Sequence, residues 1–189
     1  YTFENFVVGP SNRFAHAAAE AVVKFPGSRF NPLLIYGGKG LGKTHLLHAI
    51  CNKATKINPK IRVIYTPCEA FLKNFVRSIQ TKGDPFAFLN RYYRSDILLI
   101  DDVQILEGKQ QTQNELYLIF DQLYNAKRQI VLTSDSHPKL LKLDERLMSR
   151  FYWGLVVEIE PPTLEMRVAI IVKKTEALGL KFPDNVVEF

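Results

Sequence analysis

Short apolar runs recur along the chain and predict the strands of a sheet. They fall at residues 33–36, 62–65, 97–100, 129–132 and 155–157. An apolar run without polar alternation is typical of a strand that is buried on both faces of a parallel sheet. Segments of helical length separate these runs, so the pattern predicts an α/β fold in which a five-stranded parallel sheet lies between helices.

The segments between the predicted strands have the period of amphipathic helices. In the stretch 71–79 the apolar residues fall at positions i, i+1, i+4, i+5 and i+8, which makes Val76 a core position, and the stretch 116–123 repeats the pattern. We also expect a helix at 13–24, with Ser11 as its N-cap, and a helix at 43–56 after a glycine-rich loop. Each helix is expected to bury one face and expose the other.

A break in the chain follows the last predicted strand, where two prolines stand together at 161 and 162. The next stretch, 163–178, has the pattern of an amphipathic helix. Its apolar residues are Leu164, Val168, Ile171 and Val172. We therefore expect a domain boundary near residue 160.

The composition indicates a soluble globular domain. Of the 189 residues, 47% are hydrophobic and 23% are charged, which excludes a disordered chain. No apolar run approaches the roughly 20 residues of a membrane-spanning helix. Because the chain starts without an initiator methionine and stops inside an amphipathic segment, we expect a fragment of a longer protein.

Charge and cysteine content leave several partners open. The 25 lysines and arginines exceed the 19 acidic residues, giving a net charge of +6, which permits a polyanionic partner such as nucleic acid or nucleotide. The basic residues are scattered, as on an ordinary solvated surface. Cys51 and Cys68 have the spacing of neither a disulfide framework nor a zinc site, and they suit a reducing cytoplasm.

The clearest motif follows the first predicted strand. It satisfies the P-loop pattern G-x-x-x-x-G-K-[ST] and reads Gly37-Gly38-Lys39-Gly40-Leu41-Gly42-Lys43-Thr44. The glycines let backbone N–H groups turn inward around phosphates, and the following helix adds partial positive charge at its N-terminus. Lys43 is expected to reach the β- and γ-phosphates of ATP, and the Thr44 hydroxyl to bind Mg²⁺. The alternative is a glycine-rich turn with a surface lysine. Lys39, a further charge within the loop, could add to the field that attracts the phosphates or face solvent, and solvent is favoured.

Two carboxylates end the third predicted strand, at the sheet edge where parallel strands present ligand sites. Asp101 is expected to hold Mg²⁺ through water, and Asp102 to accept a proton from the attacking water, as in a Walker B motif. Adjacent aspartates also occur as ordinary strand-end turn formers. A strand at 62–65 between the two motifs is typical of NTPases with an inserted strand and not of simple nucleotide kinases.

Polar residues also follow the fourth predicted strand. Thr133, Ser134 and Asp135 would reach the same sheet edge, where they could sense the γ-phosphate or orient water. Alternatively they begin a turn toward Pro138.

Two arginines, Arg146 and Arg150, lie four residues apart and so share one face of a predicted helix. A guanidinium in such a place is a candidate arginine finger, which stabilises the transition state on a neighbouring subunit's phosphate. The two arginines could equally pair with Asp144 or Glu145.

The chain resembles the AAA+ ATPase domain of the bacterial chromosomal replication initiators, the DnaA family, over essentially all of its length. The residues that carry the resemblance are Tyr1 to Asn12, Asn31 to Leu33, Gly37 to Ala49, Leu98 to Gln104, Leu132 to Asp135 and Ser149 to Leu155. The resemblance implies a P-loop NTPase fold of the AAA+ class. It places the nucleotide-binding α/β domain at 1–160, an initiator-specific helical insertion at 68–94, and the truncated beginning of a helical lid at 161–189.

The resemblance also implies the roles of individual residues. Nucleotide-binding residues outside the P-loop motif would be Val8, Gly9, Asn12 and His45. Asp135 would act as sensor 1, and Arg150 as the arginine finger, with Arg146 beside it at the subunit interface. The implied activity is a slow, assembly-dependent hydrolysis of ATP to ADP and phosphate, carried by Lys43, Asp102, Asp135 and Arg150, which serves mainly as a switch.

For partners, the resemblance implies origin DNA, held as a single strand by the insertion in a right-handed filament of ATP-bound subunits. Val76 and Lys109 match positions that touch the strand's backbone, and Gln111 stands where the family commonly has an arginine, which removes one charge from that contact. The replicative helicase, regulators and acidic membrane lipids are implied for the full-length protein. The sensor 2 arginine and the duplex-binding domain would lie beyond Phe189.

A helicase loader of the same clade is the nearest alternative, because it shares the ATPase core and the insertion. The box from Trp153 to Leu155 and the opening segment from Phe6 to Asn12 favour the initiator.

More distant alternatives are a P-loop kinase of a small acceptor and a nucleotide-free scaffold. The kinase is disfavoured by an acidic pair on a late strand and by the arginine pair on a helix. A scaffold would show no Mg²⁺-dependent ATP binding. A metal site at His45 and His48, spaced i, i+3, lacks a third ligand in the sequence and is the weakest idea.

Overall fold

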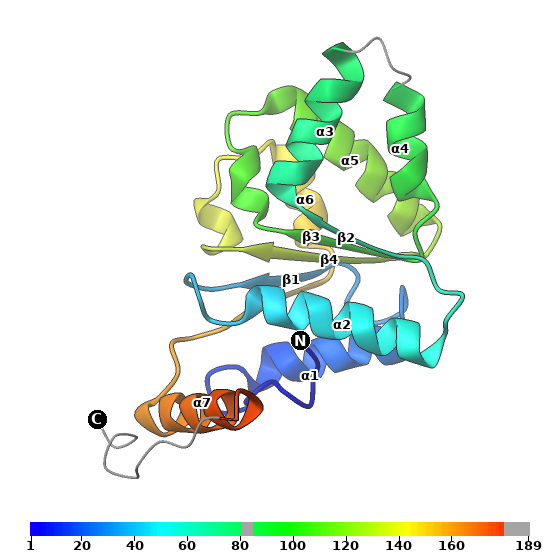
Figure 1. The fold of residues 1–189 in the computed structure, drawn as a ribbon. Helices are drawn as coiled ribbons and strands as arrows, with labels where there is room; N and C mark the ends of the chain where they lie inside the picture. The colour runs from blue at the N-terminus through cyan, green and yellow to red at the C-terminus, as the bar shows by residue number, and fades with distance from the viewer. Residues whose placement is uncertain (81–84, 180–189) are drawn as a thin grey trace.

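The chain folds as one parallel sheet with helices on both faces (Figure 1). The computed structural model describes residues 1–80 and 85–179, with 85–87 by their backbone only. The strands are β1 (Leu33–Tyr36), β2 (Val63–Pro67), β3 (Ile97–Asp101), β4 (Gln129–Ser134) and β5 (Leu155–Glu158). The α-helices are α1 (Arg13–Lys24), α2 (Lys43–Ile57), α3 (Cys68–Gln80), α4 (Pro85–Tyr93), α5 (Gln110–Asn125), α6 (Glu145–Phe151) and α7 (Leu164–Ala177). Two 3₁₀ turns follow β3 and β4, at Val103–Leu106 and Pro138–Leu140.

The five strands pair in the order β2-β3-β4-β1-β5, and every pair is parallel. This confirms the five-stranded parallel sheet expected from the apolar runs. The central strands β3 and β4 are buried along their whole length, and β1 along most of it. The outer strands β2 and β5 are mostly half-buried, because each has a neighbour on one side only. β2 also starts one residue later and ends two residues later than its apolar run predicts.

Helices cover both faces of the sheet. In Figure 1, α3, α4, α5 and α6 lie above the sheet, α1 and α2 lie below it, and α7 lies beyond α1. Each face has its own core: Leu46 and Ile50 belong to the one under α1 and α2, and Phe71, Phe120 and Phe151 to the other. Within the two described ranges, no helix is both long enough and apolar enough to cross a bilayer.

The predicted cap of the first helix is wrong by one residue. α1 begins at Arg13 with Asn12 as its N-cap, and Asn12 makes no side-chain bond to the first turn. Its side chain instead bonds the preceding loop, donating to Val7 O and accepting from Gly9 N, each at 2.9 Å. The Ser11 hydroxyl lies 3.2 Å from the sulfur of Met166. The hydrogen bonds between Asn12 and the preceding loop thus place Asn12, and not Ser11, at the N-cap position.

α7 forms where the pattern predicts a helix, but most of the apolar residues that predicted it do not lie on the buried face of the helix. Leu164, Ile171 and Val172 are exposed, whereas Met166 is buried. Met166 packs against Gly9, where a Cβ atom would come within 2.4 Å of the Met166 sulfur. In the described part of the chain, the side of α7 that meets the α/β domain is therefore the side of Met166.

Gly154 lets β5 approach β1 closely. A Cβ atom at this position would lie 1.9 Å from the carbonyl oxygen of Pro32 and 2.6 Å from the Pro32 nitrogen. The next residue, Leu155, begins the pairing of the two strands by donating its N–H to the same carbonyl oxygen at 3.0 Å. A side chain at Gly154 would therefore push β5 away from the sheet.

Gly154→Ala is expected to lower the free energy of unfolding by about 1–3 kcal/mol, because it forces an atom into a packed site. Gly38→Ala is a matched control, since its Cβ would meet only Leu41 Cδ1, at an ordinary 3.5 Å. It should change the free energy by less than about 1 kcal/mol. Urea unfolding followed by circular dichroism measures both values. Equal losses in the two variants would contradict the role of Gly154.

Candidate functional site

The glycine-rich loop lies between β1 and α2, at the carboxyl end of the sheet. Gly40 and Gly42 have φ values of 78° and 100°, a region that other residues rarely adopt. A Cβ atom at Gly42 would also come within 2.9 Å of the Phe6 ring. α2 begins immediately afterwards at Lys43, so its free N–H groups and positive end face the loop. Inward N–H groups and a helix N-terminus are the features of loops that bind phosphate groups.

Lys43 is buried within this loop. Its ammonium group donates to the carbonyl oxygens of Gly37 and Gly38, at 2.7 and 2.9 Å. Burial lowers the pKa of Lys43, whereas the nearby carboxylates of Asp102, Asp101 and Asp135 raise it. The structure thus brings together the lysine of the loop and the acidic residues from two strand ends. Lys39 is exposed.

Asp101 is the last residue of β3 and is buried, with 4% of its surface exposed. Its Oδ2 atom accepts hydrogen bonds from the Thr44 hydroxyl at 2.7 Å and from the Tyr65 hydroxyl at 3.1 Å, and its Oδ1 atom accepts one from the Thr133 hydroxyl. The predicted partners Thr44 and Asp101 therefore lie side by side. A hydroxyl and a carboxylate are the hard oxygen donors that Mg²⁺ prefers, so this donor set fits the ion.

Asp102 leaves the strand in the left-handed region, with φ 63°, a conformation that aspartate tolerates better than most residues. Its N–H donates to the Thr133 hydroxyl at 2.9 Å, and its Oδ1 atom accepts from the Gln104 amide at 3.0 Å. The same glutamine accepts the N–H of Asp135 at 3.2 Å. Gln104 therefore links the carboxylate of Asp102 to the backbone of Asp135, the two aspartates that sequence reasoning places near the γ-phosphate.

Sequence reasoning missed three contributors to this site. Tyr65 and Gln104 had no role, and Thr133 was expected to act on phosphate or water instead of on Asp101. A signal was present in the sequence for two of them, because Tyr65 and Thr133 are polar residues near the ends of predicted strands. Their contact with Asp101 depends on β2 and β4 being the two neighbours of β3.

The segment before α1 forms a second wall of the site. Val8 is 47% exposed and Gly9 lies against Met166, while Asn12 holds the loop through its two bonds to Val7 and Gly9. Phe6 joins this segment to the glycine-rich loop through its contact with Gly42. The three residues that the resemblance assigns to adenine thus lie on one loop next to the phosphate site.

Both histidines of α2 have neighbours that account for them. The Nε2 atom of His45 lies 2.8 Å from the carbonyl oxygen of Thr2, and its ring packs on Phe6. Burial lowers the pKa of His45. His48 packs on Tyr65, with ring centroids 4.4 Å apart. Among the described residues, no group of three histidine, cysteine or acidic side chains is placed to hold a metal ion, so the idea of a histidine metal site finds no support.

The two arginines of α6 make ion pairs within their own chain. Arg146 pairs with Asp144 at 3.1 Å, as the sequence allowed. Arg150 pairs with Asp121 on α5 at 3.0 Å, and neither Asp144 nor Glu145 is its partner. These contacts explain how α6 is oriented.

Arg150 is packed more tightly than Arg146. Its side chain is 18% exposed, its Nη2 atom also donates to the Tyr117 hydroxyl at 2.9 Å, and its guanidinium lies 3.9 Å from the centre of the Trp153 ring. Its Nε atom is buried and has no hydrogen-bond partner among the described residues. The guanidinium is therefore held in one orientation at the surface of α5 and α6.

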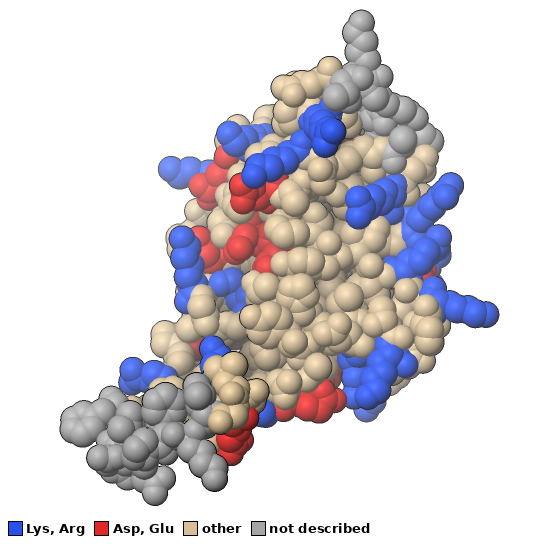
Figure 2. Space-filling view, in the orientation of Figure 1, with Lys and Arg blue, Asp and Glu red and all other residues tan. Residues whose placement is uncertain are grey.

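The predicted DNA-contacting residues lie on the other face of the sheet from α1 and α2. Val76 on α3 is 40% exposed, so its assignment as a core position was wrong, and Phe71 and Phe75 carry the packing of that helix. Lys109 and Gln111 are exposed at the start of α5. Figure 2 shows lysine and arginine side chains spread around this view of the molecule and not gathered in a single patch.

A phosphate loop after β1, an acidic pair at the end of β3 and a polar β4 terminus, on a sheet of order β2-β3-β4-β1-β5, define a P-loop NTPase of the AAA+ class. Comparison with known proteins gives the family. The chain belongs to the DnaA family, since residues 1–158 match the family model described as bacterial DnaA ATPase domain. The resemblance and fold class expected from the sequence are thus confirmed.

Individual relatives agree with this membership. The chain is 52% identical to the chromosomal replication initiator protein DnaA of Symbiobacterium thermophilum over 190 residues, which is 100% of this chain and 41% of that protein. The chain therefore spans less than half the length of this relative.

Solved structures show the same likeness. Domain III of the Thermotoga maritima replication initiation protein DnaA is 48% identical with a TM-score of 0.96, covering 100% of this chain and 79% of that one. A replication initiator DnaA bound to AMPPCP and single-stranded DNA is 42% identical with a TM-score of 0.91, covering 100% and 58%. A DnaC helicase loader, 17% identical with a TM-score of 0.70 over 84% and 96%, shares the fold alone.

Asn12→Ala is expected to lower the free energy of unfolding by about 1–2 kcal/mol, because it leaves the partly buried N–H of Gly9 and carbonyl of Val7 without their partner. Asn5→Ala is the control, since Asn5 is exposed, and it should change the value by less than about 0.5 kcal/mol. Chemical denaturation of both variants measures the difference. A neutral Asn12→Ala would show that the loop does not need this side chain.

Proposed function

We propose that the chain is the ATP-binding and slowly hydrolysing AAA+ module of a replication initiator that works in the cytoplasm. The observation that carries the proposal is the buried Lys43 ammonium in its glycine loop, facing Asp101, Asp102 and Asp135. Its membership of the DnaA family and a relative bound to AMPPCP, an ATP analogue, support the same ligand. Two free cysteines, Cys51 and Cys68, suit a reducing compartment.

Each residue of the site has a task in this proposal. The N–H groups of the loop from Gly37 to Thr44 bind the phosphates of ATP, and Lys43 moves from the loop carbonyls to the β- and γ-phosphates. Thr44 and Asp101 hold Mg²⁺, which neutralises phosphate charge when it is bound. Asp102 accepts the proton of the attacking water, and Asp135 senses the γ-phosphate.

The base of ATP lies against the loop that precedes α1. Val8 and Gly9 contact the adenine in this proposal, and Asn12 keeps their backbone in place. His45 supports the same corner, because it packs on Phe6 and bonds the backbone of Thr2. Met166 of α7, in the beginning of the proposed lid at 161–189, lies against Gly9 on this side.

Hydrolysis requires a second subunit in this proposal. Arg150 of one subunit reaches the γ-phosphate of the next, with Arg146 beside it at the interface, and ATP binding thereby drives assembly into a filament. The rigid packing of Arg150 on Tyr117, Asp121 and Trp153 supports this role, because a guanidinium held in advance loses little entropy when it binds phosphate. Hydrolysis then resets the assembly.

The DNA ligand is a single strand of the replication origin. The relative bound to single-stranded DNA supports this proposal, as does the exposure of Val76 on α3 and of Lys109 at the start of α5. The insertion at 68–94 supplies the contact surface, and Gln111 contributes no charge to it. The replicative helicase, regulators and acidic membrane lipids are partners of the whole initiator. A helicase loader is disfavoured, since the loader compared is only 17% identical.

Lys43→Ala is expected to weaken ATP binding by roughly a hundredfold or more, because it removes the charge that pairs with the phosphates in a buried site. Lys39→Ala is the matched control, a loop lysine that is exposed, and it should bind ATP almost normally. Titration with a fluorescent ATP analogue in the presence of Mg²⁺ measures both. Ordinary affinity in Lys43→Ala would overturn the site.

Arg150→Ala is expected to bind ATP normally but to lose ATP-dependent assembly on oligo(dT), with assembly-dependent hydrolysis reduced by roughly 10³-fold. Asp121→Asn separates this role from local packing, because it removes the ion pair and keeps the guanidinium. It should still assemble. Sedimentation with ATP and Mg²⁺ measures assembly, and Arg150→Ala oligomers of wild-type size would exclude an arginine finger at this position.

A further inference from the structure

The sheet has an open edge at β5. Within residues 1–80 and 85–179 this strand pairs with β1 alone and is the last in the sheet order. Leu155 and Ile159 donate their N–H groups to β1, at Pro32 O and Tyr36 O. Since residues of a parallel strand point alternately to either side, the N–H and C=O groups of Val156 and Glu158 face away from the sheet. Such a row of backbone groups is a template for a further strand.

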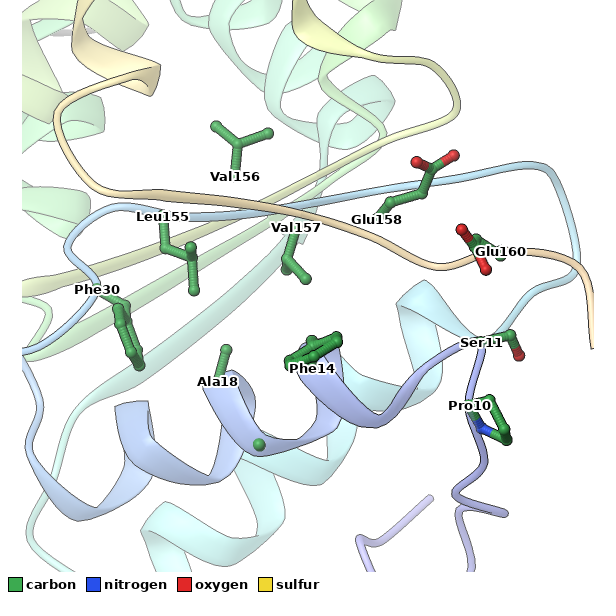
Figure 3. A pocket seen from close by; sticks show the side chains of 11 residues that line it. Pro10, Ser11, Phe14, Ala18, Phe30, Leu155, Val156, Val157, Glu158 and Glu160 are labelled. Atoms are coloured by element: carbon green, nitrogen blue, oxygen red, sulfur yellow. The ribbon is translucent and has the colours of Figure 1, made fainter.

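An apolar groove lies directly beneath this edge. It has a volume of about 510 Å³ and is lined from β5 by Leu155 and Val157 and from α1 by Phe14 and Ala18. Figure 3 shows these side chains turned toward one another, with Phe30 at one end of the groove. Phe14 is 66% exposed and Phe30 is 39% exposed. Single exposed apolar residues are common on protein surfaces, but two exposed aromatic rings at the rim of one apolar groove form a continuous patch, which is typical of a binding surface.

The groove is the space that the side chains of a sixth strand would fill. A strand paired to Val156 and Glu158 would lie about 4.8 Å from β5, and every second side chain would point down onto α1. Small residues there, Ala17 and Ala18, leave room for them. None of the residues that line the groove belongs to the phosphate loop or to the acidic strand ends.

The charge at one end of the groove selects the partner. Glu158 and Glu160 come at the end of β5 opposite Phe30, with the Glu158 carboxylate pointing to the side of the strand away from Phe14 (Figure 3), and neither has an ion-pair partner among the described residues. The Glu158 carboxylate accepts a hydrogen bond from the Tyr36 hydroxyl at 2.9 Å. At the other side of the rim, Arg13 is already stacked on the Phe14 ring, 4.9 Å from its centre. A lysine or arginine of the partner would complement these two carboxylates, which no described cation pairs with.

We propose that the edge of β5 and this groove bind an extended segment of a partner protein, which adds a parallel or antiparallel strand to the sheet. Its inward-facing residues are apolar and enter the groove between Phe14 and Phe30, and a basic residue lies over Glu158 and Glu160. Backbone bonds to Val156 and Glu158 give affinity, and the groove and the acidic end give specificity. This surface is additional to nucleotide and DNA binding.

The test selects random peptides displayed on phage against the immobilised 189-residue chain. Enriched peptides are expected to carry apolar residues at every second position and a lysine or arginine near one end. A synthetic peptide of that consensus is then titrated against variants. Val156→Pro should weaken it by about tenfold or more, because it removes an outward N–H that β1 does not use. Phe14→Asp and Glu158→Lys should weaken it similarly.

Leu118→Asp on α5 is the control for loss of an exposed apolar residue, since Leu118 is 47% exposed on another face, and it should bind the peptide normally. Unfolding curves and ATP binding of each variant show whether the fold is intact, and Phe14→Asp keeps the proposal testable if Val156→Pro unfolds. Selected peptides without the alternating pattern, or binding that survives both Val156→Pro and Phe14→Asp, would overturn the proposal. So would a concentration-dependent dimer of the chain that Val156→Pro abolishes, because the edge would then serve a second copy.

Discussion

The carboxylate of Asp101 is the point on which the site depends. It is nearly inaccessible to water, and a buried charge is stable only when hydrogen bonds replace its hydration. Three hydroxyls supply these bonds, from Thr44 at the start of α2, Tyr65 on β2 and Thr133 on β4. The same bonds tie the phosphate loop and both neighbouring strands to the end of β3. A hydroxyl that donates to Asp101 still has lone pairs, so Thr44 can offer its oxygen to a cation without leaving the carboxylate.

Most of the fold and the centre of the site could be predicted, because their signals are local. The loop from Gly37 to Thr44 and the acidic pair each need only neighbours in sequence, and the apolar runs identified all five strands. Tyr65 and Gln104 could not be assigned, since their contacts depend on the order of the strands, which no local pattern encodes. The ion pair between Arg150 and Asp121 could not be predicted for a similar reason, since it depends on how α6 packs on α5. Periodicity failed at Val76 and on α7 because it counts apolar positions without knowing how much surface the rest of the molecule can cover.

The division of the site between elements bears on the proposed switch. The phosphate loop and the acidic strand ends lie on one edge of the sheet, whereas Arg150 is fixed to α5 by contacts within its own chain. No described hydrogen bond or ion pair joins that arginine to the phosphate loop of the same chain. Under the proposed function, a single copy therefore carries the phosphate-binding and Mg²⁺-binding groups, and the arginine that stabilises the charge developing on hydrolysis comes from a neighbouring copy. Under the proposed function, the rate of hydrolysis reports how many neighbours a subunit has.

The segment before α1 connects the start of the chain to α2 and to the phosphate loop. Tyr1 packs on the rings of His45 and His48, Phe6 contacts Gly42, and the Asn12 side chain bonds the loop at Val7 and Gly9 that precedes it. These contacts join the segment to α2, to the phosphate loop and to the turn before α1, and Phe6 is also buried in the core on that face of the sheet. Tension applied at Tyr1 is thus passed to α2 and the phosphate loop. Under the proposed function, pulling on this end in a single-molecule experiment would loosen the grip on ATP.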